Sequence, residues 1–381
     1  MTDLTIGICG LSISSGNKGC SALAISFLDI LYKISNGNIA LVIYEKEKPN
    51  LEKFPILSKF HNITHIEYHF KNIFKLPSIY NSFKKCDYVF DFTEGDSFTD
   101  LYGVNRFLST SFLKYAAIKN RSNLIIGPQT IGPFQNKMIE IMAKRILEKS
   151  YYIYSRDKLT EIYVDKLIGK KCMTVMDVAF GLPYTVNNPM NDGKIRLGIN
   201  ISGLLWKNEK KSIGLTVDYR NYIINLIDRY YNDMKYEIHL IAHVIAPKSD
   251  DDDTYIIDEI KNKYPKCLVM PYYDSPVDIK TYISGLDILT GARMHATIAA
   301  YSTKVAVIPF SYSRKFEGLF STLNYPYIIK GTVETTENAL VQTIQFIENY
   351  KSLKSSIIDN YYIVDRNLDK FKQSLIDILN D

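Results

Sequence analysis

Short apolar runs alternate with longer segments of helical spacing along the first half of the chain. Leu4–Cys9, Ile39–Tyr44 and Asp87–Phe92 are such runs, and their length and their β-branched and aromatic content are typical of strands. Residues 20–34 instead place apolar side chains every three or four positions, which predicts a helix. Strands that alternate with helices in this way predict βα units around a parallel sheet.

A segment without periodicity interrupts this alternation near the middle of the chain. Residues 182–194 read LPYTVNNPMNDGK, a Pro- and Asn-rich stretch that marks a domain boundary. A second βα series follows, and the last part of the chain has the spacing of amphipathic helices. The predicted organisation is an N-terminal domain over residues 1–183, a second domain over residues 195–335 and C-terminal helices over residues 336–381.

The predicted fold class is α/β, with two Rossmann-like domains whose parallel sheets face each other across a cleft. A chain of 381 residues is long enough for two domains that each bury a core. In open parallel sheets, ligands bind beyond the carboxyl ends of the strands. The loops that follow strands are therefore where the chemistry is expected.

The composition excludes several other classes of protein. With 46 Lys+Arg against 41 Asp+Glu, the net charge of +5 is too small and too dispersed to indicate a nucleic-acid partner. The five cysteines are far apart and form no CxxC pair, so neither zinc nor a disulfide framework is expected. No basic residue precedes the first apolar run, and no apolar stretch is long enough to cross a bilayer. The expected location is the cytoplasm, with peripheral association with a membrane left open.

Arginine is rare in this chain, and the first one is Arg106. An arginine fork binds carboxylate or phosphate through paired hydrogen bonds, so an Arg beside a glycine turn is of interest. In the segment GARMHA, Arg293 lies in the turn after a strand and His295 in the first turn of the next helix. Together with the helix N-terminus they predict a site for a small dianion. The alternative is a histidine that is satisfied locally by backbone.

Two further basic residues also follow predicted strands. Arg156, in YSRDK, would reach an anion in the cleft, or would pair with Asp157 or a helix end. Lys315, in VIPFSYSRKFEG, would line the same mouth as Arg293, or would belong to a solvated loop.

Two loops of the N-terminal domain carry candidate polar groups. The loop GLSISSGNKGCSAL places Gly16 and Gly19 before a helix, where backbone amides can bind an anion or where small residues only form a tight turn. Four carboxylates, Asp91, Glu94, Asp96 and Asp100, surround Gly95 after the strand DYVFDF. They could bind a cation, hold sugar hydroxyls or act as a general base, and the alternative is that Asp96 or Ser97 caps the following helix.

Two other features do not predict metal sites. His61, His65 and His69 have helical spacing, but their segment is rich in β-forming residues, which would separate them. The run Asp250–Asp253 lacks the glycine and the terminal glutamate of a calcium loop, and capping of a helix at Thr254 is the favoured interpretation.

The order of these loops resembles that of the polysaccharide pyruvyl transferases. The resemblance runs from about residue 7 to residue 320 through NKGCSAL, EGDSFTD, GPQTIGPF, YSRDKLT, DVAF, AHV followed by acids, and ARMHATIAAYSTKVAVIPFSYSRK. It implies a glycosyltransferase-B-like architecture. It also implies transfer of pyruvate from phosphoenolpyruvate to a sugar of a cell-surface glycan precursor, which forms a cyclic ketal and releases phosphate.

The resemblance also implies roles for individual residues. His295 and Arg293 would be catalytic, and Arg156 and Lys315 would bind the donor in or beside the C-terminal domain. Asn17, Gly19, Glu94 and Asp96 would lie on the acceptor side. No metal and no cofactor is expected, and phosphoenolpyruvate is the donor substrate.

The chain departs from the family in two loops. Cys20 replaces an acidic residue that commonly follows the first-loop glycine, and Thr93–Asp96 replaces a run of glycines. Both departures lie in the predicted acceptor domain. The identity of the acceptor is therefore left open. Two other functions compete with pyruvyl transfer, namely a nucleotide-sugar-dependent glycosyltransferase of the same architecture and a non-catalytic glycan-binding protein. The expected partners are a small donor and a glycan or lipid-linked sugar acceptor, with no nucleic acid.

Overall fold

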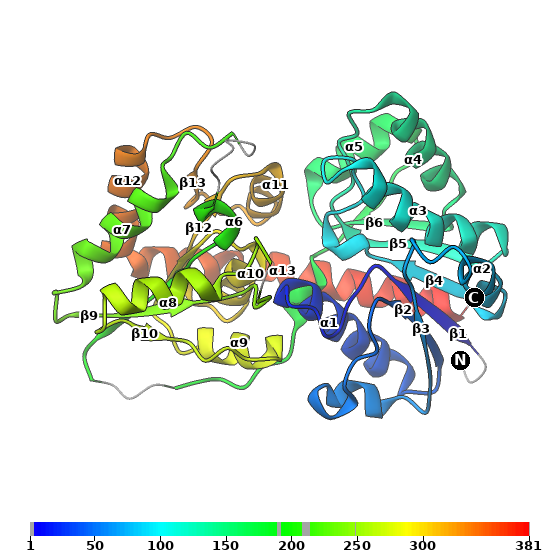
Figure 1. The fold of residues 1–381 in the computed structure, drawn as a ribbon, viewed down its shortest axis with the longest axis horizontal. Helices are drawn as coiled ribbons and strands as arrows, with labels where there is room; N and C mark the ends of the chain where they lie inside the picture. The colour runs from blue at the N-terminus through cyan, green and yellow to red at the C-terminus, as the bar shows by residue number, and fades with distance from the viewer. Residues whose placement is uncertain (1–3, 189–191, 208–213, 248, 381) are drawn as a thin grey trace. The chain divides into compact units, whose positions relative to one another are not determined.

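The structure is a computed structural model that describes residues 4–188, 192–207, 214–247 and 249–380 (Figure 1). Its contacts divide the chain into two compact units. Unit 1 contains residues 4–15, 23–178 and 364–380, and unit 2 contains residues 16–22 and the described residues of 179–363. Each unit has its own parallel sheet and its own core.

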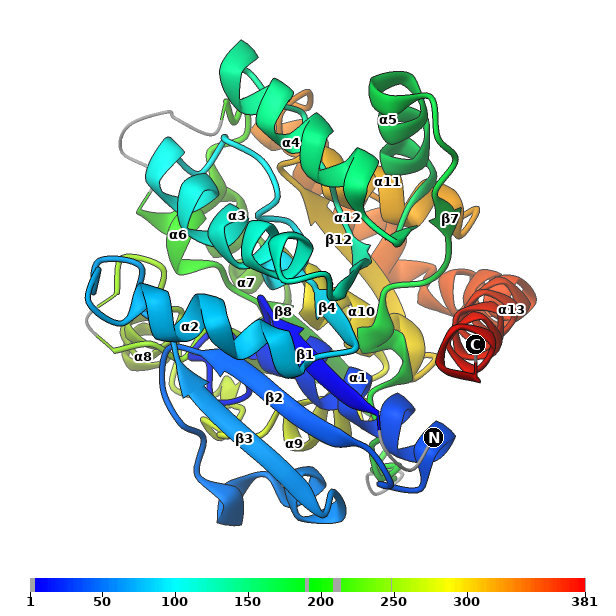
Figure 2. The same ribbon diagram turned by 90° about the vertical axis from the view of Figure 1, so that its right-hand side faces the viewer.

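Unit 1 is built on a seven-stranded sheet in which every neighbouring pair of strands is parallel. Its strand order is β3 (Asn62–Glu67), β2 (Ala40–Glu45), β1 (Thr5–Cys9), β4 (Tyr88–Asp91), β5 (Asn123–Gln129), β6 (Tyr152–Ser155) and β7 (Met173–Thr174). The order reverses between β1 and β4, which is where the loops after these strands separate to opposite sides of the sheet. Figure 2 shows this sheet.

Helices cover both faces of the sheet in unit 1. One face packs against α2 (Leu76–Ser82), α3 (Val104–Lys119), α4 (Lys137–Lys149) and α5 (Lys158–Ile168). The other face packs against α1 (Lys18–Ser35) and the end of α13 (Tyr350–Asn380), where Phe27 and Tyr154 contact Phe371. Short 3₁₀ turns occur at Leu51–Lys53, Pro55–Lys59, Phe83–Lys85 and Thr93–Gly95, and one more at Val178–Gly181 begins the passage into unit 2.

Unit 2 repeats the same design with six parallel strands. Their order is β10 (Leu268–Val269), β9 (Tyr236–Ile241), β8 (Ile195–Asn200), β11 (Ile288–Gly291), β12 (Ala306–Ser311) and β13 (Ile329–Lys330). The helices are α6 (Gly203–Trp206), α7 (Tyr219–Tyr230), α8 (Thr254–Lys263), α9 (Pro276–Ile283), α10 (Met294–Ser302), α11 (Arg314–Thr322) and α12 (Thr336–Glu348), followed by the first part of α13.

The predicted α/β class with two parallel-sheet domains is confirmed. The units differ from a simple division of the chain, because residues 16–22 pack with unit 2 and residues from Val364 onward pack with unit 1. The predicted C-terminal helices include one helix, α13, of 31 residues, which is about 46 Å long and so packs with unit 2 first and unit 1 afterwards. Within the described part of the chain, no helix combines the length and apolarity that a membrane span requires.

Candidate functional site

In unit 2, Arg293 is held by two carboxylates. It follows β11 and is the N-cap residue of α10, and its side chain is buried. Nη2 lies 2.6 Å from Oδ1 of Asp253, and Nη1 lies 2.8 Å from Oδ1 of Asp251. Its backbone N–H donates to Oδ1 of Asn200 at 2.8 Å, which ties the start of α10 to the end of β8. The guanidinium therefore has a fixed position.

Asp253 joins several loops at this position. Its carboxylate accepts hydrogen bonds from the backbone N–H groups of His243, Val244 and Gly203 at 2.8–3.0 Å, besides those from Arg293. Burial alone would lower the pKa of the Arg293 guanidinium, but the charges of Asp253 and Asp251 outweigh burial and raise that pKa above its ordinary value. Burial raises the pKa of the Asp253 carboxyl, although Arg293 and the backbone N–H groups counteract this. The hydrogen-bonded contact between Asp253 and Arg293 organises the carboxyl ends of β8, β9 and β11.

His295 lies in the first turn of α10, as predicted, and the first turn of α1 packs against it. A Cβ atom added to Gly19 would come within 2.2 Å of Nδ1 of His295. No residue larger than glycine fits there without moving the imidazole. Gly19 therefore contacts His295 in unit 2, and its assignment to an acceptor side stays a prediction.

The segment around Gly19 is attached to the loop after β9. The backbone N–H of Lys18 donates to the carbonyl of His243 at 3.0 Å, and Asn17 forms an antiparallel bridge with Val244. Oδ1 of Asn17 also accepts the N–H of Gly19 at 3.1 Å. These contacts bring the N-termini of α1 and α10 to the same end of unit 2.

Lys18 and His243 are buried members of this group that the sequence did not single out as site residues. Burial, followed by the positive charges of His295, Arg293 and Lys18, holds the pKa of His243 well below its ordinary value, so its imidazole is neutral at pH 7. The only sequence signal for Lys18 and His243 is that they lie in the motifs NKGCSAL and AHV, which carry the family resemblance.

Lys315 lies at the start of α11, at the same end of unit 2. Its Nζ is 5.5 Å from the ring centroid of Tyr312, and β12, which precedes this loop, pairs in parallel with β11, which precedes Arg293. The loop between β12 and α11 thus lies beside the Arg293 group, which is compatible with the predicted donor-binding role.

In unit 1, Arg156 is 1% exposed and has internal partners. Nη1 donates to Oδ2 of Asp177 at 2.8 Å, and Nε donates to Oγ1 of Thr130 at 3.0 Å. Asp157 does not pair with Arg156 in these contacts and instead caps α5 by accepting the N–H of Thr160. The predicted role of Arg156 as an anion ligand stays a prediction.

The acidic loop of unit 1 holds Glu94 and Asp96 at the carboxyl end of β4. Glu94 pairs with Arg106 of α3, and Oδ2 of Asp96 accepts the hydroxyl of Tyr102 at 3.0 Å. Neither Asp96 nor Ser97 caps the following helix, because α3 begins only at Val104. The capping alternative is wrong for this loop, and the carboxylates have other partners.

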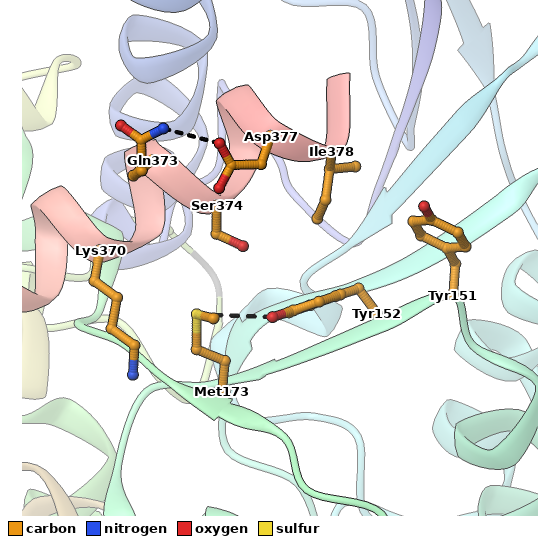
Figure 3. A pocket seen from close by; sticks show the side chains of 8 residues that line it. All are labelled: Tyr151, Tyr152, Met173, Lys370, Gln373, Ser374, Asp377 and Ile378. Atoms are coloured by element: carbon orange, nitrogen blue, oxygen red, sulfur yellow. Dashed lines mark hydrogen bonds between the residues drawn. The ribbon is translucent and has the colours of Figure 1, made fainter. Parts of the chain in front are cut away.

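A hollow of about 610 Å³ lies elsewhere in unit 1 (Figure 3). It is bordered by β6, β7 and the end of α13, and its lining consists of Tyr151, Tyr152, Met173, Lys370, Gln373, Ser374, Asp377 and Ile378. None of the residues singled out from the sequence is among them. Among the described residues, no three His, Cys, Asp or Glu side chains gather as a metal site would require, and His65 pairs with Glu45 at 3.3 Å.

Proteins of known structure with the same architecture are glycosyltransferases and epimerases of the GT-B fold. The Anabaena protein HepE in complex with UDP-glucose has a TM-score of 0.62 at 9% identity, over 99% of both chains. A Listeria monocytogenes protein classed as a UDP-N-acetylglucosamine 2-epimerase has a TM-score of 0.62 at 12% identity, over 98% of this chain and 97% of that one. The Neisseria meningitidis UDP-GlcNAc 2-epimerase bound to UDP-GlcNAc has a TM-score of 0.56 at 11% identity, over 96% and 99%.

At the level of sequence, the family model "Polysaccharide pyruvyl transferase" matches residues 17–314. The chain belongs to this family and is a transferase, as the ordered loops predicted. A search of the curated proteins found no match.

Proposed function

We propose that this enzyme transfers pyruvate from phosphoenolpyruvate to two hydroxyls of a sugar in a cell-surface glycan precursor. The observation that carries the proposal is the group of basic side chains in unit 2 at the adjoining N-termini of α1 and α10. Lys18, His243, Arg293 and His295 all belong to it. His243 belongs to the group as a neutral imidazole, and the positive charge comes from the other three side chains. Positive charge beside two helix N-termini favours a small ligand with a carboxylate and a phosphate, and phosphoenolpyruvate is such a ligand.

The chemistry needs one proton donor at the donor's methylene carbon. His295 is proposed to give a proton to that carbon, which leaves positive charge at C2 for a sugar oxygen to attack. The bond between C2 and the phosphate oxygen breaks, and the second hydroxyl closes the ketal. The two hydroxyl protons are balanced by one on the new methyl group and one on the departing phosphate.

The other basic residues are assigned to the donor as well. Asp251 and Asp253 already hold the guanidinium of Arg293. The proposed contribution of Arg293 is therefore to hold the N-terminus of α10 in place and to keep a positive charge near the donor. Lys315 and Arg156 are proposed as further anion ligands, and Glu94 and Asp96 as acceptor residues. No cofactor is included in the proposal.

The test is incubation of the protein with labelled phosphoenolpyruvate and candidate glycan precursors, including lipid-linked sugars. The expected result is sugar-dependent release of phosphate and acid-labile label on the sugar. The matched variant is His295→Asn, which should bind phosphoenolpyruvate but release at least about 100-fold less phosphate.

A second candidate is a nucleotide-sugar-dependent glycosyltransferase, because the proteins of similar fold include structures solved with UDP or UDP-sugars. Calorimetry with phosphoenolpyruvate, UDP-glucose and UDP-GlcNAc separates the two. Binding of a UDP-sugar without binding of phosphoenolpyruvate would contradict the pyruvyl transfer. If neither binds and His295→Ala leaves the protein's cellular activity unchanged, a non-catalytic glycan-binding role is favoured.

We also propose that the reaction takes place in the cytoplasm. The five cysteines are buried and free, which suits a reducing compartment. Fractionation of cells that express the protein, with a periplasmic marker as control, tests this location.

A further inference from the structure

Three successive residues after β4 have left-handed backbone conformations. The angle φ is 42° at Thr93, 54° at Glu94 and 88° at Gly95. Glycine adopts such angles without steric cost, whereas a β-branched threonine and a glutamate are strained there. Consecutive strained residues persist only where the surroundings hold them, and they point to a role for the side chains that glycine would lack.

The backbone of this turn is held on two sides within unit 1. The N–H of Glu94 donates to the carbonyl of Gly10 at 2.6 Å, and the N–H of Thr130 donates to the carbonyl of Gly95 at 2.8 Å. A Cβ atom on Gly10 would lie 2.3 Å from the backbone nitrogen of Thr93. The ends of β1 and β5 therefore fix the turn at the end of β4.

Helix α3 holds the turn from inside through Lys114. Its Nζ is 2.8 Å from Oδ1 of Asp91 and donates to Oγ1 of Thr93 at 2.7 Å, and it lies 4.5 Å from the ring centroid of Phe98. Oγ1 of Thr93 in turn donates to the carboxylate of Asp91. Lys114 and Asp91 are both buried, so the ammonium is compensated by this carboxylate and this hydroxyl.

The same helix holds the turn from outside through Arg106. Its guanidinium pairs with the carboxylate of Glu94 and donates to Oγ of Ser97 at 2.8 Å. The side chain of Glu94 is 30% exposed, whereas Thr93 is buried. The turn thus presents one reachable carboxylate, in a fixed place, at the edge of the sheet where ligands bind.

We propose that Glu94 binds and deprotonates the acceptor hydroxyl, and that Thr93 and Lys114 are positioning residues that hold it in the strained turn. This inference rests on the proposed pyruvyl transfer. The carboxylate accepts a hydrogen bond from the hydroxyl and takes its proton as the sugar oxygen bonds to C2 of the donor. That proton then leaves with the phosphate.

The first test is Glu94→Gly, because glycine removes the strain together with the carboxylate. The urea midpoint should be unchanged or higher, while sugar-dependent phosphate release should fall by about 100-fold. The KM for phosphoenolpyruvate should be unchanged. The matched control is Arg121→Gly, which relieves a φ of 63° elsewhere in unit 1 and should leave the transfer unchanged.

The positioning role is tested by a conservative pair at Thr93. Thr93→Ser keeps the hydroxyl that Lys114 and Asp91 bind and should keep the transfer. Thr93→Val keeps the shape but loses the hydroxyl, and it should raise the KM for the sugar while leaving the KM for phosphoenolpyruvate unchanged. Equal sugar KM values for the two variants would overturn the positioning role.

Failure of this inference is distinguishable from failure of the proposed function. Full transfer by Glu94→Gly, or a parallel loss of stability and transfer, would overturn the role of Glu94 alone. If the wild type releases no phosphate from phosphoenolpyruvate, the proposed function fails, and calorimetry with methyl glycosides of glucose, galactose, mannose and N-acetylglucosamine then decides. Weaker sugar binding by Glu94→Gly supports Glu94 as the hydroxyl ligand, and equal or absent binding in both proteins overturns it.

Discussion

At Arg293, one buried cation has two acidic partners that differ in exposure. Asp253 is fully buried and also accepts three backbone N–H groups, whereas the side chain of Asp251 is 38% exposed. Loss of a buried partner leaves a charge and several amides without compensation, and loss of an exposed one is offset by water. The two carboxylates should therefore contribute very different amounts to stability.

Replacement of Asp253 by Ala is expected to lower the free energy of unfolding by about 3–5 kcal/mol. The matched control, Asp251→Ala, should lower it by about 1 kcal/mol or less. Urea denaturation followed by circular dichroism measures both. Similar losses in the two variants would show that Asp253 is not the main partner of Arg293.

A methyl group at Gly19 should act through His295. Gly19→Ala is expected to displace the imidazole, with a stability loss of about 1–3 kcal/mol from overpacking and a clear fall in kcat. The double variant Gly19→Ala/His295→Ala should transfer no less than His295→Ala alone. A further loss in the double variant would mean that the methyl group disturbs something other than His295.

At the scale of elements, Lys280 of α9 binds the chain segment that leads from the sheet of unit 1 into unit 2. It is buried, and its Nζ donates to the carbonyls of Phe180 and Leu182 at 3.0 and 2.9 Å. Burial lowers the pKa of Lys280 to about 7. Since the unfolded lysine keeps its proton up to a pH of about 10.4, the unfolded state binds more protons than the folded state above pH 7.

Stability should therefore rise with pH between 7 and 9, by as much as about 1.4 kcal/mol per pH unit from this group. Lys280→Met removes the titrating group. The difference in the free energy of unfolding, wild type minus variant, should therefore become more positive from pH 7 to pH 9. Urea titrations at pH 7, 8 and 9 measure the difference. Parallel pH profiles would contradict a depressed pKa at Lys280.

The elements themselves follow largely from local patterns, and the contacts around the site do not. The apolar run Ile39–Tyr44 predicts a strand, and β2 (Ala40–Glu45) is found there, because a buried strand is a continuous apolar run. β13, only two residues long, has no such signal. The role of Asp253 was missed because its partners, Arg293 and His243, are distant in sequence, and a run of aspartates before a helix indicates capping. The N-cap residue of α8 is Asp253, whose side chain makes no capping hydrogen bond, whereas Asp252 accepts the N–H of Thr254 at 3.4 Å and its hydroxyl at 2.7 Å.

At the scale of the whole molecule, α13 belongs to both units. Its residue Tyr361 donates to the carbonyl of Ser302 in unit 2, and further along Ser374 contacts Tyr154 and Phe371 packs against Phe27 in unit 1. A local pattern predicts that such a segment is helical and amphipathic, but it does not reveal which core each turn covers. Only the long-range contacts supply that information.

Phe371→Ala should weaken unit 1 selectively, by about 3–5 kcal/mol, because the ring is fully buried there. Hydrogen exchange should then increase in the strands of unit 1 and be unchanged in those of unit 2. The control on the same helix is Ile358→Ala, whose side chain is 52% exposed and whose replacement should have little effect. Equal exchange in both units would show that they unfold together.

Each unit includes a short segment from the other part of the chain, and this determines how chimeric enzymes should be assembled. In a hybrid whose crossover lies between the two units near residue 180, residues 16–22 of one parent would have to pack against α10 of the other parent. Gly19 and His295, which are in contact, would then come from different proteins. The tail from Val364 would likewise be separated from the sheet that it covers. Domain-swapped hybrids of this enzyme should therefore be built in discontinuous blocks, with the first turn of α1 inherited together with the C-terminal half.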